Sequence, residues 1–113
     1  MLIKNKTNKT IIAENAEFYD DALSKFIGLM FSAKPKVLVF KFNKGMKISL
    51  HMLFVFFPID VLFLNKDKIV VDKKENFRSF TFYKSKETAM YAVELANGTI
   101  KKTKTKVGDE ISF

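Results

Sequence analysis

Proton transfer is the first chemistry suggested by the polar residues of the segment ISLHMLFVFFPIDVLFLN, residues 48–65. This segment has no Lys or Arg, yet it holds the only histidine, His51, and the aspartate Asp60 among apolar residues. Histidine titrates near neutral pH, and burial can raise the pKa of a carboxyl group. Both side chains are therefore candidates for acid–base work. We expect a binding pocket that includes Asp60, His51, Glu94 and Ser49.

Each of these residues also has a structural interpretation. A carboxylate two positions after Pro58 can accept hydrogen bonds from turn amides, so Asp60 could simply fix a corner of the chain. His51 could be a ring at the edge of the core with one satisfied nitrogen, and Glu94 could lie on a rim. The sequence leaves both interpretations open.

Motifs for established enzyme chemistries are absent. The chain has no cysteine, which excludes disulfides, thiolate nucleophiles and cysteine-based zinc sites. It also lacks G-x-S-x-G, H-x-x-x-H, D-x-D-x-D, P-loop and G-x-G-x-x-G patterns. We therefore predict no metal and no cofactor, and the catalytic residues, if there are any, stay unassigned.

Basic residues suggest an anionic partner. The net charge is +8, with lysine supplying nearly all of the positive charge and Arg78 as the single arginine. Lysines cluster near the C-terminus, so the candidate anion contacts are Arg78, Lys101, Lys102 and Lys104. The simpler alternative is a solvated face at the end of a short helix. The aromatic residues Phe80, Phe82 and Tyr83 lie near Arg78 in the sequence and could stack on nucleic-acid bases.

The apolar run at residues 48–65 does not suit a membrane span. A spanning helix needs about 20 apolar residues, and Asp60 would cost roughly 3 kcal/mol near the bilayer centre. Pro58 would also interrupt the helix. We predict two buried strands with Pro58 at the bend between them. The start of the chain resembles no signal peptide, so we expect a cytoplasmic location.

The elements that would position these residues are mostly short strands. The spacing of apolar residues predicts a helix over residues 15–31 and a second, short helix over 100–107, where an edge strand is the alternative. Polar residues predict breaks at 43–45 and 73–76. Strands are predicted at residues 2–3, 10–13, 37–42, 48–55, 59–64, 69–71, 78–83, 89–95 and 109–113. The expected fold is α+β and mainly β: one domain, residues 1–113, with a compact antiparallel barrel-like sheet of about seven short strands and one or two short helices.

Three blocks of the chain resemble a known family, domain of unknown function 192. They are KFIGLMF, HMLFVFFPIDVLFLNKDKIV and AMYAVELANGTIKKTKTKVGDEISF. The matching positions are Lys25, Gly28, Leu29, Met30, Met52, Pro58, Ile59, Asp60, Phe63, Glu94, Gly98, Gly108 and Asp109. The resemblance implies a compact mainly β, barrel-like domain with a small helix and no established activity. The chain departs from the family pattern at His51, where an aromatic residue is expected, and at Leu53, Phe54 and Val55, where many members carry polar residues.

Three functions follow as hypotheses. The first is a non-enzymatic ligand-binding or interaction module, the second is nucleic-acid or anion binding through the lysines, and the third is a small enzyme with Asp60 as acid or base. The sequence does not identify the ligand or the oligomeric state.

Overall fold

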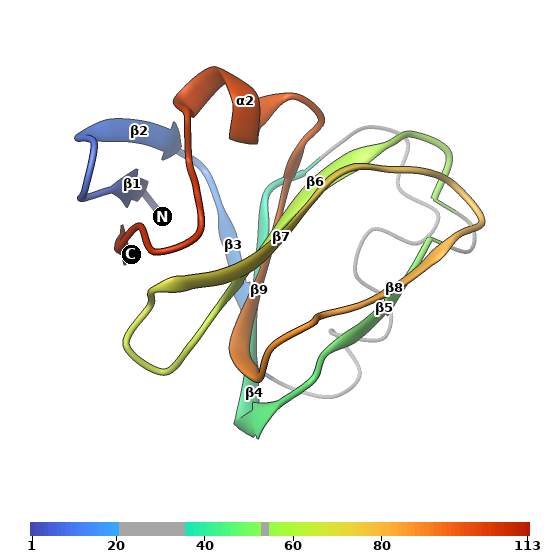
Figure 1. Ribbon diagram of the computed structural model, residues 1–113. Coiled ribbons are helices and arrows are strands. Elements are labelled where there is room, and N and C mark those ends of the chain that lie inside the picture. The colour runs from blue at the N-terminus through green and yellow to red at the C-terminus, as the bar shows by residue number, and fades with distance from the viewer. Residues whose placement is uncertain (21–35, 53–54) are drawn as a thin grey trace.

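The computed structural model describes residues 1–20, 36–52 and 55–113, and its centre is a twisted five-stranded sheet (Figure 1). The pairing within this sheet is antiparallel except between β3 and β4, which run parallel. In spatial order the strands are β3 (Glu17–Tyr19), β4 (Leu38–Met46), β9 (Ala89–Ala96), β6 (Ile59–Leu64) and β7 (Val70–Phe77).

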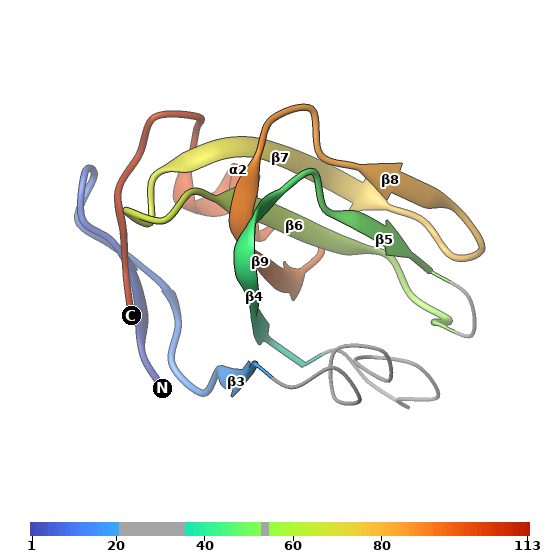
Figure 2. The same ribbon diagram turned by 90° about the horizontal axis from the view of Figure 1, so that it is seen from below.

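Smaller elements cover the two faces of this sheet. One face packs against helix α2 (Thr99–Thr103) and a three-stranded sheet of β1 (Ile3–Asn5), β2 (Thr10–Ala13) and β10 (Ile111–Ser112). The other face packs against a two-stranded ribbon of β5 (Ser49–His51) and β8 (Phe82–Lys84). In Figure 1, β6 and β7 pass between α2 and this ribbon. The two chain ends lie side by side in both views (Figure 2), because β1 pairs with β10.

Strand β6 supplies residues to both cores. All six of its residues are buried. Leu62 and Leu64 join the core under α2, whereas Ile59, Val61 and Phe63 join the core under the ribbon. The prediction of a doubly covered strand that starts just after Pro58 is confirmed, because alternate residues of a strand point to opposite faces.

Hydrogen bonds to Asp72 of β7 join the ribbon to the main sheet. The Tyr83 hydroxyl and the Lys86 amide donate to Asp72 at 2.7 and 2.9 Å. Burial alone would raise the pKa of Asp72, but these hydrogen bonds outweigh it and hold the pKa below its ordinary value. Burial, together with the bond to Asp72, raises the pKa of Tyr83 to about 12.

The structure corrects the expected fold in several places. The described sheets do not close into a barrel, and residues 1–20, 36–52 and 55–113 hold ten strands where about seven were expected. Residues 73–76 and 43–45, predicted as breaks, lie inside β7 and β4. In β7, Lys73 and Lys74 pair with β6, so pairing overrides their polar character. Of the described residues in the predicted strands 78–83 and 48–55, only those in β8 and β5 are strand; residues 53–54 lie outside the described residues.

The two predicted helices have different outcomes. The first helix was predicted over residues 15–31. Within this range, Glu17–Tyr19 is a strand, because it pairs with β4, and residues 21–31 lie outside the described residues. The second is confirmed as α2, which is shorter than expected and ends at Lys104 in the left-handed region, with φ 54°. Within the described part of the chain, no helix has the length and apolar character needed to cross a membrane.

Candidate functional site

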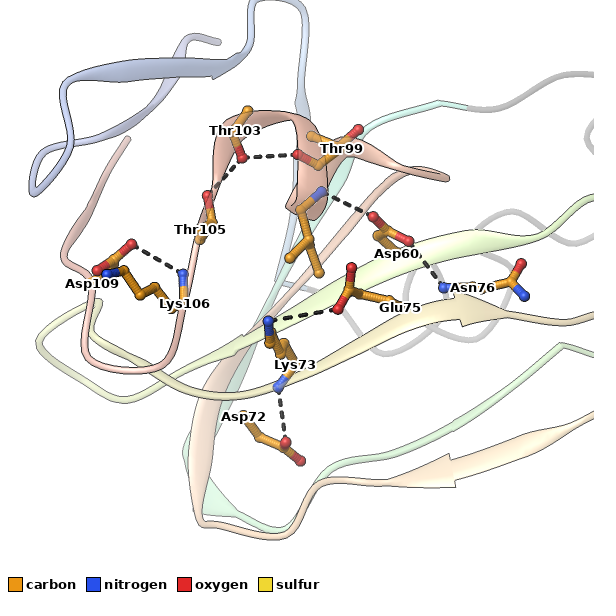
Figure 3. Close-up of polar contacts among 11 residues, drawn as sticks. Asp60, Asp72, Lys73, Glu75, Asn76, Thr99, Thr103, Thr105, Lys106 and Asp109 are labelled. Atoms are coloured by element: carbon orange, nitrogen blue, oxygen red, sulfur yellow. Dashed lines mark hydrogen bonds and ion pairs between the residues drawn. The ribbon is translucent and has the colours of Figure 1, made fainter.

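Asp60 is fully engaged by backbone amides. One carboxylate oxygen, Oδ1, accepts from the Asn76 amide at 3.0 Å, and Oδ2 accepts from the Ile100 amide at 2.9 Å (Figure 3). The side chain is 1% exposed. It therefore ties β6 to both β7 and α2. No acidic residue lies in the first turn of α2, so Asp60 supplies from another strand the acceptor that a capping residue would provide.

Three of the residues expected to share a pocket, Asp60, Glu94 and Ser49, do not converge. Asp60 lies on the face of β6 that packs under α2, because its carboxylate reaches Ile100. Glu94 pairs with Leu38 and Val61, which belong to the core on the opposite face of the sheet. The sheet therefore separates the two carboxylates.

The other two expected pocket residues lie on the ribbon. Ser49 is exposed on β5 and pairs with Lys84. The backbone of His51 belongs to β5, and its side chain lies outside what the structure describes. The described geometry thus offers no pocket that joins Asp60, Glu94 and Ser49.

Glu94 is the residue in the described chain with the clearest signature of a proton-binding group. Burial raises the pKa of its carboxyl group to about 7. A carboxyl group in an apolar face prefers the neutral form, since the charged form loses hydration there.

This raised pKa predicts a pH-dependent stability. The folded state holds the Glu94 proton more tightly than the unfolded state, so the stabilisation is complete below the ordinary pKa of 4.5 and is lost as pH rises toward 7. Because the Glu94 side chain is only partly covered, we expect a loss of only about 1–2 kcal/mol. In Glu94→Gln, the change in unfolding free energy between pH 5 and pH 8, measured in urea, should shrink by that amount. An unchanged pH dependence would contradict it.

A lysine-lined depression lies between α2 and β7. It has a volume of about 530 Å³ and is open to solvent. Its lining residues are Lys73, Glu75, Ile100, Lys101, Lys104, Thr105 and Lys106. Lys73 and Glu75 form an ion pair with N–O separation 3.6 Å, which leaves the other three lysines without a carboxylate among these lining residues. The depression is therefore electropositive.

Two of the four expected anion contacts line the depression. Lys101 and Lys104 line the depression, whereas Lys102 and Arg78 are exposed outside it. Sequence reasoning missed Lys73 and Glu75 as site residues, because residues 73–76 were predicted to be a loop. The signal that could have found them is the alternation of Lys73 and Glu75, which places both on one face of a strand.

Metal ligands do not gather in the described ranges. Among residues 1–20, 36–52 and 55–113, no three His, Cys, Asp or Glu side chains lie close enough to hold a metal ion together.

Comparison with known proteins assigns a family. The family model DUF192, described as "Uncharacterized ACR", matches residues 2–113. The chain belongs to the DUF192 family. The family has no assigned function, so membership supports the fold and the motif positions and leaves the activity open.

Archaeal proteins resemble this DUF192 chain in sequence, and two solved bacterial structures resemble it in fold. The UPF0127 protein PF1050 of Pyrococcus furiosus is 36% identical over 111 residues, covering 96% of this chain and 95% of the relative. A solved structure from Sinorhizobium meliloti, provisionally described as a transcription regulator, has a TM-score of 0.87 at 22% identity and covers 98% and 89% of the two chains. A protein of unknown function from Novosphingobium aromaticivorans has a TM-score of 0.87 at 17% identity and covers 99% and 82%. The two solved structures show that the fold is shared.

Four of the DUF192 motif positions have a backbone role in the described structure. Asp60 and Asp109 both accept from main-chain amides. Gly98 and Gly108 have φ of 89° and 99°, a region that disfavours residues with a Cβ atom. At these four motif positions the described structure therefore shows a structural role.

Proposed function

We propose that this protein is a non-enzymatic binding module, acting as one domain, for a phosphate-bearing anion held in the lysine-lined depression. The observation that carries the proposal is the composition of its lining: four lysines, three of them on or next to α2, face a single glutamate. Lysine ammonium groups bind phosphate oxygens as point charges and tolerate many geometries. A shallow electropositive surface of this kind suits an extended anion better than a small molecule that must be enclosed.

The alternative of an enzyme with Asp60 as acid or base has less support. Both of its oxygens already accept backbone hydrogen bonds, and the side chain is absent from the lining of the depression. A general base must come within hydrogen-bond reach of the substrate proton, and Asp60 is 1% exposed.

The proposal includes the location of the protein in the cell. We place the protein in the cytoplasm, supported by the complete absence of cysteine, which fits a reducing compartment. The description of the S. meliloti protein as a transcription regulator would agree with an anion-binding surface, but at 22% identity that protein contributes the fold alone.

Removal of two lysines tests the site. The double substitution Lys101→Ala and Lys104→Ala should weaken binding of labelled inorganic polyphosphate about 5- to 30-fold at low salt, since each exposed ion contact contributes up to about 1 kcal/mol. It should also flatten the dependence of affinity on salt concentration. Fluorescence anisotropy titrations at several salt concentrations would measure both effects.

The matched control removes two exposed lysines elsewhere, Lys4→Ala and Lys66→Ala, and keeps the same net charge. Equal weakening in both double variants would mean that total charge, and not the depression, attracts the anion. Absence of polyphosphate binding by the unmodified protein at low salt would refute the proposed function.

A further inference from the structure

Three phenylalanines are exposed at the end of the β5–β8 ribbon. Phe56, Phe80 and Phe82 are 64%, 59% and 71% exposed. The rings of Phe56 and Phe80 meet edge to face, with centroids 6.0 Å apart, although they come from different loops. We call these three residues the aromatic tip. Exposed aromatic surface gathered in one place is costly in water and marks an interaction site.

Hydrogen bonds hold the turn that carries Phe80 against Met52. The Phe80 amide donates to the Met52 carbonyl and the Met52 amide donates to the Thr81 carbonyl, both at 2.9 Å. The Thr81 hydroxyl closes the turn by donating to the Arg78 carbonyl. Phe80 has a φ of 61°, in the left-handed region that bulky residues rarely adopt. A bulky ring kept at a strained, exposed position is more readily explained by binding than by folding.

The charges around the aromatic tip select an anionic partner. Between Glu75 and Glu87 the chain has no carboxylate, and its charged residues there are Arg78, Lys84 and Lys86. Lys84 lies two residues after Phe82 on β8, so the ammonium group and the ring are on the same exposed side. A second copy of this chain would bring like charges together at this surface, which disfavours self-association.

The edge of the main sheet connects the aromatic tip with the lysine-lined depression. Strand β7 is an edge strand, and it ends at Phe77, next to Arg78. On β7, Lys73 lines the depression, and the Lys74 ammonium lies 5.4 Å from the centre of the Tyr83 ring on the ribbon side. Arg78 lies five positions after Lys73, roughly 16 Å along an extended strand.

We infer that the aromatic tip stacks the unpaired bases of a single-stranded nucleic acid whose phosphates contact the cations of β7 and the ribbon. This inference rests on the proposed function, because it names the polymer that carries the phosphates. Stacking on exposed rings beside cations is the common mode of binding single strands, and every base has a face that can stack. In a duplex those faces are covered by neighbouring bases.

An anionic membrane is the competing partner for exposed phenylalanines beside lysines. The depression and the ribbon lie on opposite faces of the main sheet. A flat bilayer cannot contact both, whereas a flexible strand can follow the edge along β7. The geometry therefore favours the polymer.

The experiment compares two polyanions that differ in having bases. Binding of a labelled single-stranded oligothymidylate and of labelled inorganic polyphosphate of similar charge is measured by fluorescence anisotropy on the full chain. We expect the oligothymidylate to bind more tightly. The double substitution Phe80→Gly and Phe82→Thr should weaken oligothymidylate binding about 10-fold or more and leave polyphosphate binding unchanged, as loss of base stacking requires.

Controls separate stacking from folding. Glycine suits the φ of Phe80 and threonine suits a strand, so the double variant should keep the melting temperature of the unmodified protein. Phe18→Thr removes a different exposed phenylalanine, on β3, and should change neither affinity.

The outcomes are distinguishable. If both polyanions bind equally and the double variant binds both normally, the stacking inference is overturned while the proposed function stands. If neither binds, both fall. If vesicles containing anionic lipid bind through Phe80 and Phe82 while the oligothymidylate does not, the aromatic tip belongs to a membrane-binding surface and the inference is overturned.

Discussion

Asp60→Ala is expected to lower the free energy of unfolding by about 3 kcal/mol, which for a domain of this size is a large share of the total. The substitution leaves the amides of Asn76 and Ile100 without their acceptor, and the Ile100 bond is buried. An unsatisfied buried donor costs about 1–3 kcal/mol, and bonds to a charged acceptor are at the upper end. Urea unfolding followed by circular dichroism would measure the loss.

Asp60→Asn provides a finer test of the same contact. Asparagine keeps one acceptor oxygen, so it can retain one amide partner, while its NH₂ group faces the other amide as a second donor. We expect a loss of roughly half that of alanine, about 1–2 kcal/mol. Asp67→Asn, at an exposed turn position, serves as the control and should have little effect. If Asp60→Asn unfolded at the same urea concentration as the unmodified protein, Asp60 would be free for chemistry, contrary to its geometry here.

Asn5→Ala is expected to cost about 2–4 kcal/mol, because it removes buried hydrogen bonds that join the two ends of the chain. The side-chain nitrogen of Asn5, Nδ2, donates to the Asp109 carboxylate at 2.8 Å and to the Thr105 hydroxyl at 3.2 Å. Its oxygen accepts from the amides of Thr7 and Asn8 at 3.0 and 3.2 Å. Asn5 has no exposed surface, so water cannot replace these bonds.

A double-mutant cycle assigns this loss to the contact itself. The double variant Asn5→Ala with Asp109→Ala should lose much less unfolding free energy than the two single variants together, with a coupling energy of about 1–3 kcal/mol. Asn8→Ala, which removes an exposed side chain from the same turn, should be milder. Additive losses for Asn5 and Asp109 would show that each residue acts through other partners.

The sequence was sufficient where one local signal dominated. The apolar run before Asn65 predicted a buried strand, and β6 is that strand, since a strand with apolar residues on both faces is stable only when both faces are covered. Asn97-Gly98 predicted a turn, and Gly98 has the positive φ that such a turn needs. Polar strands gave no comparable signal. Lys73 and Lys74 are in β7 because β6 offers a free edge, and such pairing depends on residues distant in the chain.

In the candidate site, too, some residues could be selected from the local sequence and others only from the fold. Lys101 and Lys104 could be selected from the local density of charge, and the structure places both at the depression. Lys73 completes that surface from 28 positions earlier in the chain, so no window of sequence contains it. The aromatic tip likewise needs Phe56 and Phe80 from two loops.

By itself, the sequence determined the mainly β class, the family and the buried position of β6, and it favoured the short helix α2 over an edge strand. Each follows from short-range periodicity or from a motif. Only the tertiary structure decided the role of Asp60. Its partners, Asn76 and Ile100, lie 16 and 40 residues away, and a carboxylate is a cap or a catalyst according to what its oxygens meet in space. Hydrogen bonds between distant segments form when the sheet twists and α2 packs against it, so they are set by the fold as a whole.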